Sequence, residues 1–535
     1  MPRYRSPVFP FVRPPELDGR AGRRWPVAIV GAGPVGLAAA IDLALAGIAS
    51  VVIDESNVVS TGSRAICWSK RTLEIFDRLG VGDRMVAKGV TWKVGRLFHR
   101  DREVYAFDLL PEPGHKRPAF INLQQYYVEE YLIDRARDFP DLIELRFMSR
   151  VTGAGQDPDR AWVDVETPEG KYRLAADYVI ACDGVRSTVR RSLGLDFIGR
   201  AFEERFLITD VEMAAEFPSE RWFWFEPPFH DGQSALLHKQ PDNIYRIDLQ
   251  LGSGADPEEE RRPERVIPRI RAMVGERPFE VDWISVYSFQ CRRLARFVHD
   301  RVIFAGDSAH IVSPFGARGG NGGIQDVDNL CWKLAAILKG EGPPALLETY
   351  NTERVHGADE NILNSARATS FMTPKSRMER LFRDEVLALA STHPFARQLV
   401  NSGRLSRPCS LLGFSLGTED TSGLGGMMVP GAPCLDAPVR GANGEDGWLL
   451  DHLGGSFIAL GFGALPPTLL GVRRLTVGAS GDLRDPQGLL AARYDGAPGV
   501  VYLIRPDQHV AARFREPTAA EISRALARAQ GSSNA

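Results

Sequence analysis

The sequence has few cysteines, and none has the spacing of a metal site or a redox motif. Among 535 residues there are six cysteines, and no two of them form a C-x-x-C pair. Scattered cysteines are typical of buried, reduced thiols, so neither a disulfide framework nor a zinc site is expected. The six are Cys67, Cys182, Cys291, Cys331, Cys409 and Cys434.

Long hydrophobic runs and a secretory signal are also missing. The first 25 residues contain Arg and Pro but no apolar core of the length that a signal peptide needs. The most apolar helical stretch, Leu37–Ala46, is too short to span a bilayer and contains Asp42. We therefore expect no membrane association and, by default, a cytoplasmic location.

The sequence has no excess of charge of either sign. Its net charge is −3 and its charged fraction is 25%, which is typical of a soluble globular protein. Without a basic excess or a polybasic run, no nucleic-acid partner is expected. The length is enough for about three domains of ordinary size.

Residues Val27–Asp54 have the pattern of a dinucleotide-binding unit. A strand-like run, Val27–Val30, precedes three glycines at the G-x-G-x-x-G spacing, and a helical stretch and a second apolar run follow. The first glycine permits a tight turn, the second lets the backbone approach a pyrophosphate, and the third lets the helix pack on the strand. The new helix N-terminus can bind phosphate. The glycines are Gly31, Gly33 and Gly36.

An acidic residue completes this pattern. Asp54 lies 23 residues after Gly31, where a carboxylate can accept a hydrogen bond from a ribose hydroxyl. The alternative is an ordinary glycine-rich turn without a ligand. The acidic residue favours the dinucleotide site.

One residue in a predicted loop and one in a predicted helix can make further polar contacts with a ligand. Arg64 lies before a helix predicted over Arg71–Leu79, where it can clamp a phosphate, lie over a ring system or remain solvated. Gln125 lies in the first turn of a helix predicted over 122–137.

A carboxylate also follows a later buried strand. Asp183 and Gly184 come after the run Tyr178–Ile180, and open α/β sheets bind ligands at the carboxyl ends of such strands. Taken alone, an Asp-Gly pair is more often only a turn.

Residues 201–290 change to an aromatic-rich pattern of short strands separated by turns. This pattern predicts a mainly antiparallel sheet with one side that is solvated or faces a ligand, inserted as a second domain. The expected elements are strands at Phe206–Met213, Arg221–Phe225, Ser234–His238 and Tyr245–Leu251, and a helix at Pro263–Val274.

The chain then returns to the nucleotide-binding pattern in Arg301–Leu334. A strand ends in Gly306-Asp307, a Gly/Pro-rich loop follows, and a helix begins near Gly322. Bare glycine backbone in that loop can surround a negatively charged group. A flexible linker is the alternative, but linkers seldom separate a buried strand from a strongly patterned helix.

Three motifs in this order resemble those of the FAD-dependent aromatic hydroxylases, the single-component class A flavoprotein monooxygenases. They are GAGPVG with Asp54, the stretch Cys182-Asp183-Gly184, and Arg301–His310. The resemblance covers residues 25 to about 360. The C-terminal unit resembles that of the branch containing phenol hydroxylase and 3-(3-hydroxyphenyl)propionate hydroxylase, and residues 501–511 resemble the final hairpin of that branch.

The resemblance implies an α/β fold: a Rossmann-like FAD-binding domain with an inserted mainly antiparallel β substrate domain and a C-terminal thioredoxin-like domain. Because the last domain has no C-x-x-C, it has a structural or dimerising role, and a homodimer is an alternative to a monomer. The expected boundaries are an N-terminal arm at 1–24, the FAD-binding domain at 25–200 and 291–380, the substrate domain at 201–290, linker helices at 381–429 and the C-terminal domain at 430–535.

The resemblance also implies the cofactor contacts. The first glycine motif holds the ADP half of FAD, Arg64 and Gln125 contact its phosphate and ribityl regions, and Asp183 serves both FAD and the pyridine nucleotide. Asp307 binds the ribityl chain. The expected cofactor-binding residues are Gly31, Gly33, Pro34, Gly36, Asp54, Glu55, Arg64, Gln125, Asp183, Arg186, Gly306, Asp307, Gly319, Gly320 and Asn321.

The backbone N–H groups of Gly319, Gly320 and Asn321 are expected at the N1–C2=O edge of the flavin. Reduced flavin is negatively charged along that edge, and a helix N-terminus stabilises such charge. No second G-x-G-x-x-G is found, so the resemblance implies that NAD(P)H binds transiently at the flavin face.

The implied activity is monooxygenation of a small phenolic or other activated aromatic substrate. NAD(P)H reduces FAD, dioxygen adds at the flavin C4a atom, and the C4a-hydroperoxyflavin delivers oxygen to the ring. Alternatives are another flavin oxidoreductase, such as an epoxidase or a dehydrogenase, and a non-catalytic flavin-binding regulator.

The substrate contacts are open. Pro314 matches a position beside the flavin ring, and Tyr287 matches a tyrosine that hydrogen-bonds the phenol in phenol hydroxylase. Ile66 falls where that relative has a proton-relaying carboxylate, which leaves the base unassigned. His238, Gln240 and Arg246 are candidates for it, although each also fits a core or surface role. Arg246 could instead steer a carboxylated or nitro-bearing ring.

Overall fold

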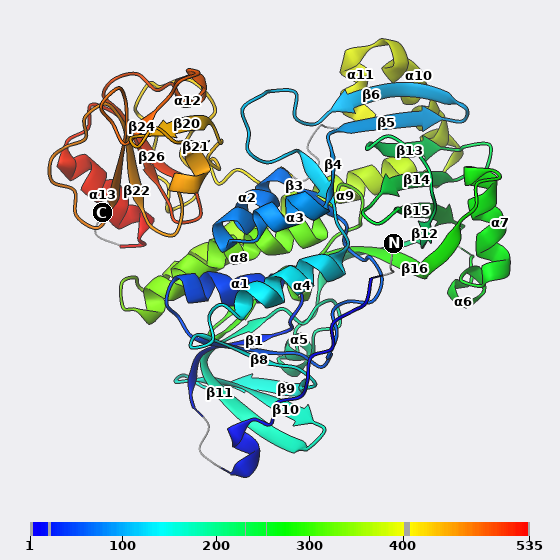
Figure 1. The fold of residues 1–535 in the computed structure, drawn as a ribbon, viewed down its shortest axis with the longest axis horizontal. Helices are drawn as coiled ribbons and strands as arrows, with labels where there is room; N and C mark the ends of the chain where they lie inside the picture. The colour runs from blue at the N-terminus through cyan, green and yellow to red at the C-terminus, as the bar shows by residue number, and fades with distance from the viewer. Residues whose placement is uncertain (1–3, 20–22, 231, 253, 401–406, 533–535) are drawn as a thin grey trace.

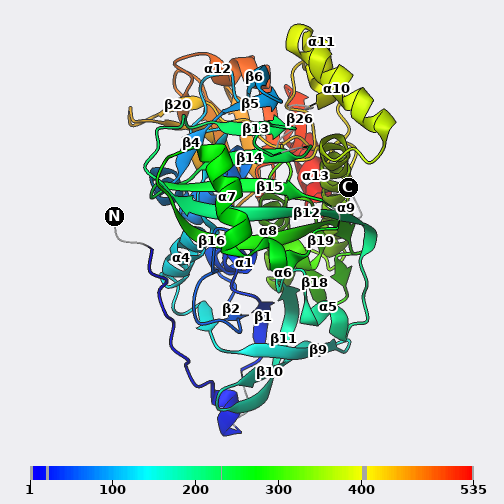
Figure 2. The same cartoon turned by 90° about the vertical axis from the view of Figure 1, so that its right-hand side faces the viewer.

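The protein is described by a computed structural model covering residues 4–19, 23–230, 232–252, 254–400 and 407–532. Figures 1 and 2 show two large sheets that share the central helices, with a C-terminal domain beside them. The linker expected at 381–429 includes residues 401–406, which lie outside this description. None of the helices in the described ranges combines the length and apolar content that a membrane span requires.

The first sheet is the expected nucleotide-binding sheet. Its parallel strands lie in the order β8-β2-β1-β11-β18, and antiparallel strands β17, β9 and β10 extend it. β1 and β2 are almost entirely buried, as strands covered on both faces are. The bounds are β1 (Trp25–Val30), β2 (Ser50–Ile53), β8 (Ile143–Arg146), β9 (Arg150–Gln156), β10 (Ala161–Thr167), β11 (Gly170–Ala181), β17 (Val298–His299) and β18 (Val302–Phe304).

Helices α1, α4 and α8 lie together against this sheet (Figure 1). The predicted helix before Gly80 is confirmed: α2 ends there because Gly80 adopts a left-handed φ of 87°. The remaining bounds here are η1 (Pro15–Asp18), α1 (Pro34–Leu45), β3 (Cys67–Ser69), α2 (Lys70–Leu79), α3 (Gly82–Lys88), β4 (Val90–Trp92), β7 (Phe120–Asn122), α4 (Gln125–Ala136), α5 (Thr188–Ser192), η2 (Gly306–Ser308), α8 (Gly319–Leu338) and α9 (Leu346–Met372).

The second sheet contains the predicted aromatic-rich strands, in the order β19-β16-β12-β15-β14-β13-β5-β6. Neighbouring pairs are antiparallel except β13 with β5. The bounds are β5 (Val94–His99), β6 (Arg102–Asp108), β12 (Ile198–Glu212), β13 (Arg221–Phe225), β14 (Ser234–Lys239), β15 (Ile244–Leu251), α6 (Pro257–Glu260), α7 (Pro263–Val274), β16 (Glu280–Arg293), β19 (His310–Ile311), α10 (Arg377–Thr392) and α11 (Pro394–Val400).

Alternate residues of this sheet face opposite sides. On one face Leu207, Val211 and Ile247 pack against α7. On the other, Phe206 and Ile208 belong to a cluster that also contains residues of α9 and α10. The second face is therefore the one turned toward the centre of the molecule.

Strands β5 and β6 differ from the expected division of the chain. They come from within residues 25–200, yet β5 pairs with β13 in register Arg221↔Gly95 to Phe225↔His99. This pairing covers the backbone edge that β13 would otherwise expose. Pairing between strands more than 100 residues apart leaves no local signal in the sequence.

The N-terminal arm packs along the first sheet. The Phe9 N–H donates to Asn57 O at 2.8 Å, and the Phe9 ring stacks on Phe147. The extended arm is thus held by a buried aromatic side chain.

The C-terminal domain is built on a seven-stranded mixed sheet in the order β21-β20-β24-β23-β22-β25-β26. Its assignment as thioredoxin-like stays a prediction. The bounds are β20 (Pro438–Gly441), β21 (Asp446–Trp448), η3 (Leu449–His452), β22 (Ile458–Phe462), β23 (Arg473–Val477), β24 (Leu483–Arg484), α12 (Leu489–Tyr494), β25 (Val500–Ile504), β26 (Val510–Arg515) and α13 (Ala519–Ala529).

A buried ionic network joins this domain to α8 and α9. Arg505 binds Glu353 through Nη1–Oε1 (2.8 Å) and Nη2–Oε2 (2.9 Å), and it also binds Asp507. Lys333 Nζ lies 2.8 Å from Glu353 Oε2. Despite its burial, the pKa of Glu353 falls to about 2 because Arg505 and Lys333 favour the ionised carboxylate.

A second contact joins the hairpin formed by β25 and β26 to α2. Arg71 donates to Gln508 Oε1, Asp507 O and Asp328 Oδ2, each at 2.8 Å. Removing one member of a buried network leaves an uncompensated charge, which costs about 3–5 kcal/mol. The docking of the C-terminal domain therefore depends on these residues.

We expect Arg505→Met to lower the free energy of unfolding by about 3–5 kcal/mol, because Glu353 and Asp507 then remain buried without the arginine that pairs with both. Urea denaturation followed by fluorescence measures the change. The control is Arg440→Met, which removes an exposed pair with Asp446 in the same domain and is expected to leave the midpoint unchanged. Equal midpoints for the two variants would contradict the role of the network.

Candidate active site

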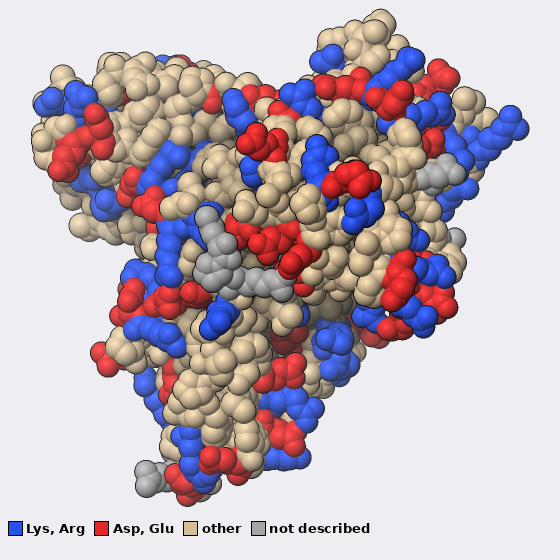
Figure 3. Space-filling model, turned by 45° about the vertical axis from the view of Figure 1, so that its right-hand side comes forward, with Lys and Arg blue, Asp and Glu red and all other residues tan. Residues whose placement is uncertain are grey.

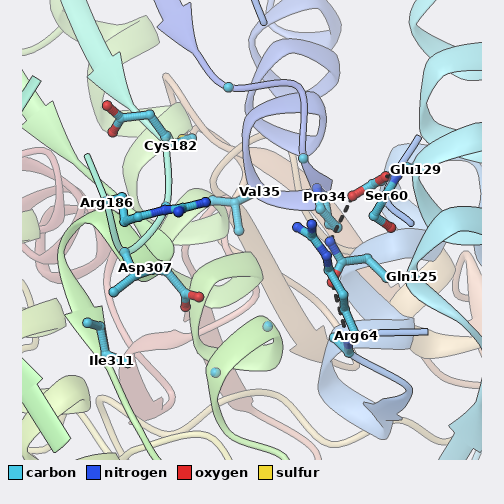
Figure 4. Close-up of a pocket in the computed structure, with 18 of the residues that line it drawn as sticks. Pro34, Val35, Ser60, Arg64, Gln125, Glu129, Cys182, Arg186, Asp307 and Ile311 are labelled. Carbon is cyan, nitrogen blue, oxygen red and sulfur yellow. Dashed lines mark hydrogen bonds between the residues drawn. The ribbon is translucent and has the colours of Figure 1, made fainter. Parts of the chain in front are cut away.

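One large cavity lies between the carboxyl ends of the first sheet and the inward face of the second. Its volume is about 1600 Å³, and its walls come from β1, β2, α4, the segment after β11, the α8 N-terminus and strands β12 to β16 (Figure 4). On the surface in Figure 3, acidic and basic side chains are interspersed, in agreement with the small net charge.

The three glycines of the first motif have different surroundings. Gly31 has φ 106°, and a Cβ there would lie 2.5 Å from Cys182 O, so no other residue fits. A Cβ on Gly36 would lie 1.9 Å from Gly31 O. Gly33 has open space around its Cβ position and lines the cavity. Gly36 does not line it and serves the packing of α1 on β1.

Two helix N-termini open into the cavity. In α1 the first helical hydrogen bond runs from Leu37 N–H to Gly33 O, and in α8 from Gly322 N–H to Arg318 O. Neither helix has a side-chain cap. The preceding N–H groups are therefore available to a ligand, and the helix dipoles favour negative charge at both places.

The structure places Gly319, Gly320 and Asn321 in the first turn of α8, which begins three residues before the expected start near Gly322. A Cβ on Gly320 would lie 3.3 Å from the Trp68 ring. The Asn321 side chain accepts a hydrogen bond from Ser69 N–H at 2.9 Å and donates one to Cys67 O at 2.9 Å. It ties β3 to α8, which leaves its backbone N–H as the group that can face a ligand.

Asp54 directly follows the last residue of β2 and lies beside the glycine turn. Its Oδ2 accepts a hydrogen bond from Ala32 N–H at 2.6 Å, and its Oδ1 accepts one from Ser56 N–H at 2.8 Å. Burial raises the pKa of Asp54, and the two backbone donors oppose this shift. Each oxygen keeps acceptor capacity for a hydroxyl. Glu55 also lines the cavity.

Asp183 presents an unsatisfied atom at the end of β11. Its Oδ2 accepts a hydrogen bond from Val189 N–H at 3.1 Å, while Oδ1 is buried and has no partner within the described residues. Burial raises the pKa of this carboxyl. A buried acceptor without a donor costs free energy, so Oδ1 points to a ligand that donates a hydrogen bond.

Figure 4 shows Arg186 reaching across the cavity toward Val35, with Asp307 below it. The Asp307 side chain is exposed, and it lines the cavity. Desolvation in the cavity raises the pKa of the Asp307 carboxyl, and the electrostatic effect of His310 opposes this shift. The neighbouring Gly306 does not line the cavity. A Cβ there would lie 3.0 Å from Val35 Cγ2, so Gly306 serves the close approach of α1.

Arg64 and Gln125 lie side by side at the opposite wall (Figure 4). Gln125 accepts a hydrogen bond from Ala65 N–H at 3.2 Å and donates one to Glu129 Oε1 at 2.8 Å. Glu129 is a cavity residue that the sequence analysis missed. Its position one helical turn after Gln125 is the signal that could have found it.

These groups fit FAD. Its pyrophosphate needs N–H donors and positive charge, which the α1 N-terminus and Arg64 offer. Its ribose and ribityl hydroxyls need carboxylate acceptors, which Asp54, Asp183 and Asp307 offer. The α8 N-terminus can face the anionic edge of the reduced ring.

The second sheet carries a row of mainly polar side chains, here called the polar row, on the side of the cavity that faces the cofactor groups. The strand register aligns Arg221 with His238, His238 with Arg246, Arg246 with Asp210 and Asp210 with Trp283. Directly opposed residues lie on the same face, and all but Asp210 line the cavity. Burial, followed by the charges of Arg221 and Arg246, lowers the pKa of His238 well below its usual value, so this imidazole is neutral.

Tyr287 and Pro314 line the same cavity. Burial raises the pKa of Tyr287, and the Asp307 carboxylate raises it further. Ile66 is also a cavity residue and is 5% exposed. An isoleucine cannot relay a proton, so Ile66 contributes an apolar wall.

Gln240 is not among the cavity residues. It donates to Asp210 Oδ1 at 3.1 Å, and burial raises the pKa of Asp210 to about 6. Arg221 and Asp248 are cavity residues that the sequence analysis missed. Alternation along β15 from Arg246 identifies Asp248, whereas Arg221 requires the pairing of β13 with β14.

Comparison with known proteins agrees with this site. The family model described as FAD binding domain matches residues 24–365. The chain is 30% identical to a 3-(3-hydroxy-phenyl)propionate/3-hydroxycinnamic acid hydroxylase of Paraburkholderia xenovorans, over 82% of this chain and 77% of that one. It is 31% identical to a 12-dehydrotetracycline 5-monooxygenase/anhydrotetracycline 6-monooxygenase of Streptomyces rimosus, over 71% and 76% of the two chains.

Solved structures have the same fold. The flavin-dependent monooxygenase PieE, in complex with FAD and substrate, superposes with a TM-score of 0.81 at 23% identity, over 95% of this chain and 99% of that one. The anhydrotetracycline hydroxylase OxyS from Streptomyces rimosus has a TM-score of 0.71 at 25% identity, over 94% and 99%. The chain therefore belongs to the FAD-dependent aromatic hydroxylases, the single-component flavoprotein monooxygenases.

Proposed function

We propose that this hydroxylase uses NAD(P)H and dioxygen to hydroxylate a small phenolic compound held against the inward face of the second sheet. The observation that best supports this is the shared cavity. Segments around residues 31, 54, 183, 307 and 319 surround the same space as His238, Arg246 and Tyr287. The cofactor groups and the substrate groups therefore face one another.

When bound, FAD supplies the redox chemistry: it accepts a hydride from NAD(P)H and activates dioxygen for transfer to an aromatic carbon. The chain positions this cofactor. Gly31–Pro34 and Arg64 would hold its phosphates, Asp54 and Asp183 its ribose hydroxyls, and Asp307 its ribityl chain. Pro314 would lie beside its ring.

The substrate hydroxyl is oriented by the polar row. Neutral His238 can accept a hydrogen bond from a phenol, and the positive charge of Arg246 favours the ionised phenolate, which is the more electron-rich ring. Tyr287 can donate a hydrogen bond to the same oxygen, because its pKa is raised and its hydroxyl is therefore protonated at neutral pH. Apolar cavity residues such as Phe206 and Ile208 exclude water from the reacting atoms.

The cytoplasmic location, the homodimer and the domain boundaries stay predictions. The six cysteines are all free thiols, which supports a reducing compartment.

The proposed reaction predicts that a phenolic substrate stimulates oxygen uptake. With the holoenzyme and a panel of phenols and hydroxybenzoates, three amounts should be equal: NAD(P)H oxidised, oxygen consumed and hydroxylated product formed. An oxygen electrode and mass spectrometry of the product measure this. An epoxide would assign another flavin reaction, and the absence of oxygen uptake across the panel would contradict the proposal.

The proposed role of Asp307 predicts that Asp307→Ala weakens FAD retention. Loss of a charge-assisted hydrogen bond to a ribityl hydroxyl should reduce the affinity for FAD about 10–100-fold. The readouts are the ratio of flavin to protein absorbance after gel filtration and the FAD dissociation constant of the stripped protein.

Glu341→Ala is the matched control, because Glu341 is exposed beyond the other end of α8. It should retain FAD as the wild-type protein does. If Asp307→Ala also purifies with full flavin and normal turnover, Asp307 has no part in the site.

A further inference from the structure

The N-terminal arm, residues 4–19, lies behind one wall of the cavity. Figure 2 shows it running down one side of the molecule, past α4 and the first sheet, to η1. None of its described residues lines the cavity, but it contacts three segments that do. These segments are the loop after β2, the segment after β8, and α4.

At the loop after β2 the arm makes a backbone contact. Val8 forms an isolated antiparallel bridge with Val58, and the Phe9 N–H donates to Asn57 O at 2.8 Å. Val58 is a cavity residue. The arm therefore pairs, as a short extra strand, with the loop that begins at the proposed ribose acceptor Asp54.

The same loop is hydrogen-bonded to the segment after β8. Met148 N–H donates to Ser56 O at 3.2 Å, and Ser149 N–H donates to Asp54 O at 2.8 Å. Asp54, Ser56 and Ser149 all line the cavity. The segment after β8 thus belongs to the same end of the site, where the adenosine half of FAD would lie.

The Phe9 ring is the main anchor of the arm. It is 3% exposed and stacks on Phe147, with ring centroids 4.5 Å apart and planes 17° from parallel. Phe147 directly follows β8 and lines the cavity. Phe147 therefore contacts the arm and also faces the cavity, which makes it the link between them.

A second anchor lies on α4. The Tyr4 ring stacks on Tyr126 with centroids 4.1 Å apart, and its hydroxyl donates to Glu130 Oε2 at 2.8 Å. The residues just before these two, Gln125 and Glu129, are cavity residues. The arm thus spans from α4 to the loop after β2 and the segment after β8.

We infer that Phe9 and Tyr4 are positioning residues, through which the arm holds the adenosine end of the FAD site in its binding conformation. This inference rests on the proposed placement of FAD. A loop that is already ordered loses less entropy when its ligand binds, so its support raises affinity without a direct contact. The arm is extended and held by few buried side chains, so it can detach without unfolding the domain.

The first test measures FAD release from the holoenzyme. Phe9→Ala removes the ring that stacks on Phe147, and we expect the FAD dissociation rate constant to rise about 5–50-fold. The flavin fluorescence that appears on dilution measures it. The flavin midpoint potential should keep the wild-type value, because the redox-active ring lies at the other end of the cofactor. Release at the wild-type rate would overturn the inference. Faster release with a shifted potential would also overturn it, because it would indicate a general loosening of the site.

Two further variants assign the effect to the anchors. Tyr4→Ala removes the contact with α4 and should also speed FAD release, so the inference can be tested even if Phe9→Ala does not fold. Val8→Ala is the matched control, because the Val8 side chain is 68% exposed on the same arm. It should release FAD as the wild type does. Equal rates for Tyr4→Ala and Val8→Ala would contradict the role of the arm.

Thermodynamic reciprocity gives a test on the wild-type chain. If the arm favours FAD binding, FAD must favour docking of the arm by the same factor. Hydrogen exchange of the Phe9 amide should therefore be slowed at least about fivefold when FAD is added to the stripped protein. An arm that only packs on the sheet would show equal protection with and without FAD, and that result would overturn the inference.

Failure of this inference can be told apart from failure of the proposed function. A hydroxylase whose Phe9→Ala and Tyr4→Ala variants retain FAD as the wild type does would leave the proposed reaction intact and overturn the role of the arm. A chain that holds FAD through its arm but consumes no oxygen with any aromatic compound would keep that role and overturn the proposed reaction.

Discussion

The close packing of α1 against α8 is the contact on which the site depends. Val35 lies over two glycines: a Cβ on Gly323 would lie 2.6 Å from Val35 Cγ2, and one on Gly306 would lie 3.0 Å from it. Because this contact leaves little room for a side chain on either glycine, two helices that begin 285 residues apart can present their N-termini to one cavity. The positive ends of both helices can then act on one dinucleotide.

The C-terminal domain contacts α2, α8 and α9 through its β25–β26 hairpin. Its hairpin places Arg505 and Asp507 among Lys333 of α8 and Glu353 of α9, while Arg71 of α2 binds the hairpin backbone. The domain therefore contacts the helices that build the cofactor site without lining the cavity itself. The ionic network supports the predicted structural role of this domain, which needs no redox-active cysteine.

The parts of the site that could be predicted from sequence are those with local signals. The turn at Gly31, the acidic end of β2 at Asp54 and the glycine-rich start of α8 each lie within one short segment. Gly36 is predicted both to pack the helix on the strand and to hold the cofactor, and Gly306 only to hold the cofactor, yet the structure shows close packing against α1 or its glycine turn at both Cβ positions. Local spacing identifies a required glycine but does not separate a packing requirement from a ligand contact.

Features that depend on long-range pairing could not be predicted. The joining of β5 to β13 and the alignment of Arg221 with His238 and Arg246 arise only when the sheet forms. The side-chain role of Asn321 in tying β3 to α8 is of the same kind. The proposed substrate contacts thus depend on the register of the sheet, whereas the proposed cofactor contacts lie mostly in local motifs.

The central claim is that these distant segments enclose a single flavin, and FAD stoichiometry tests it most directly. The purified chain, reconstituted with excess FAD and freed of unbound ligand, is analysed by flavin absorbance against protein concentration. The account predicts one FAD per chain, with a spectrum that changes when an aromatic ligand enters the cavity. A colourless protein that takes up no FAD would contradict it.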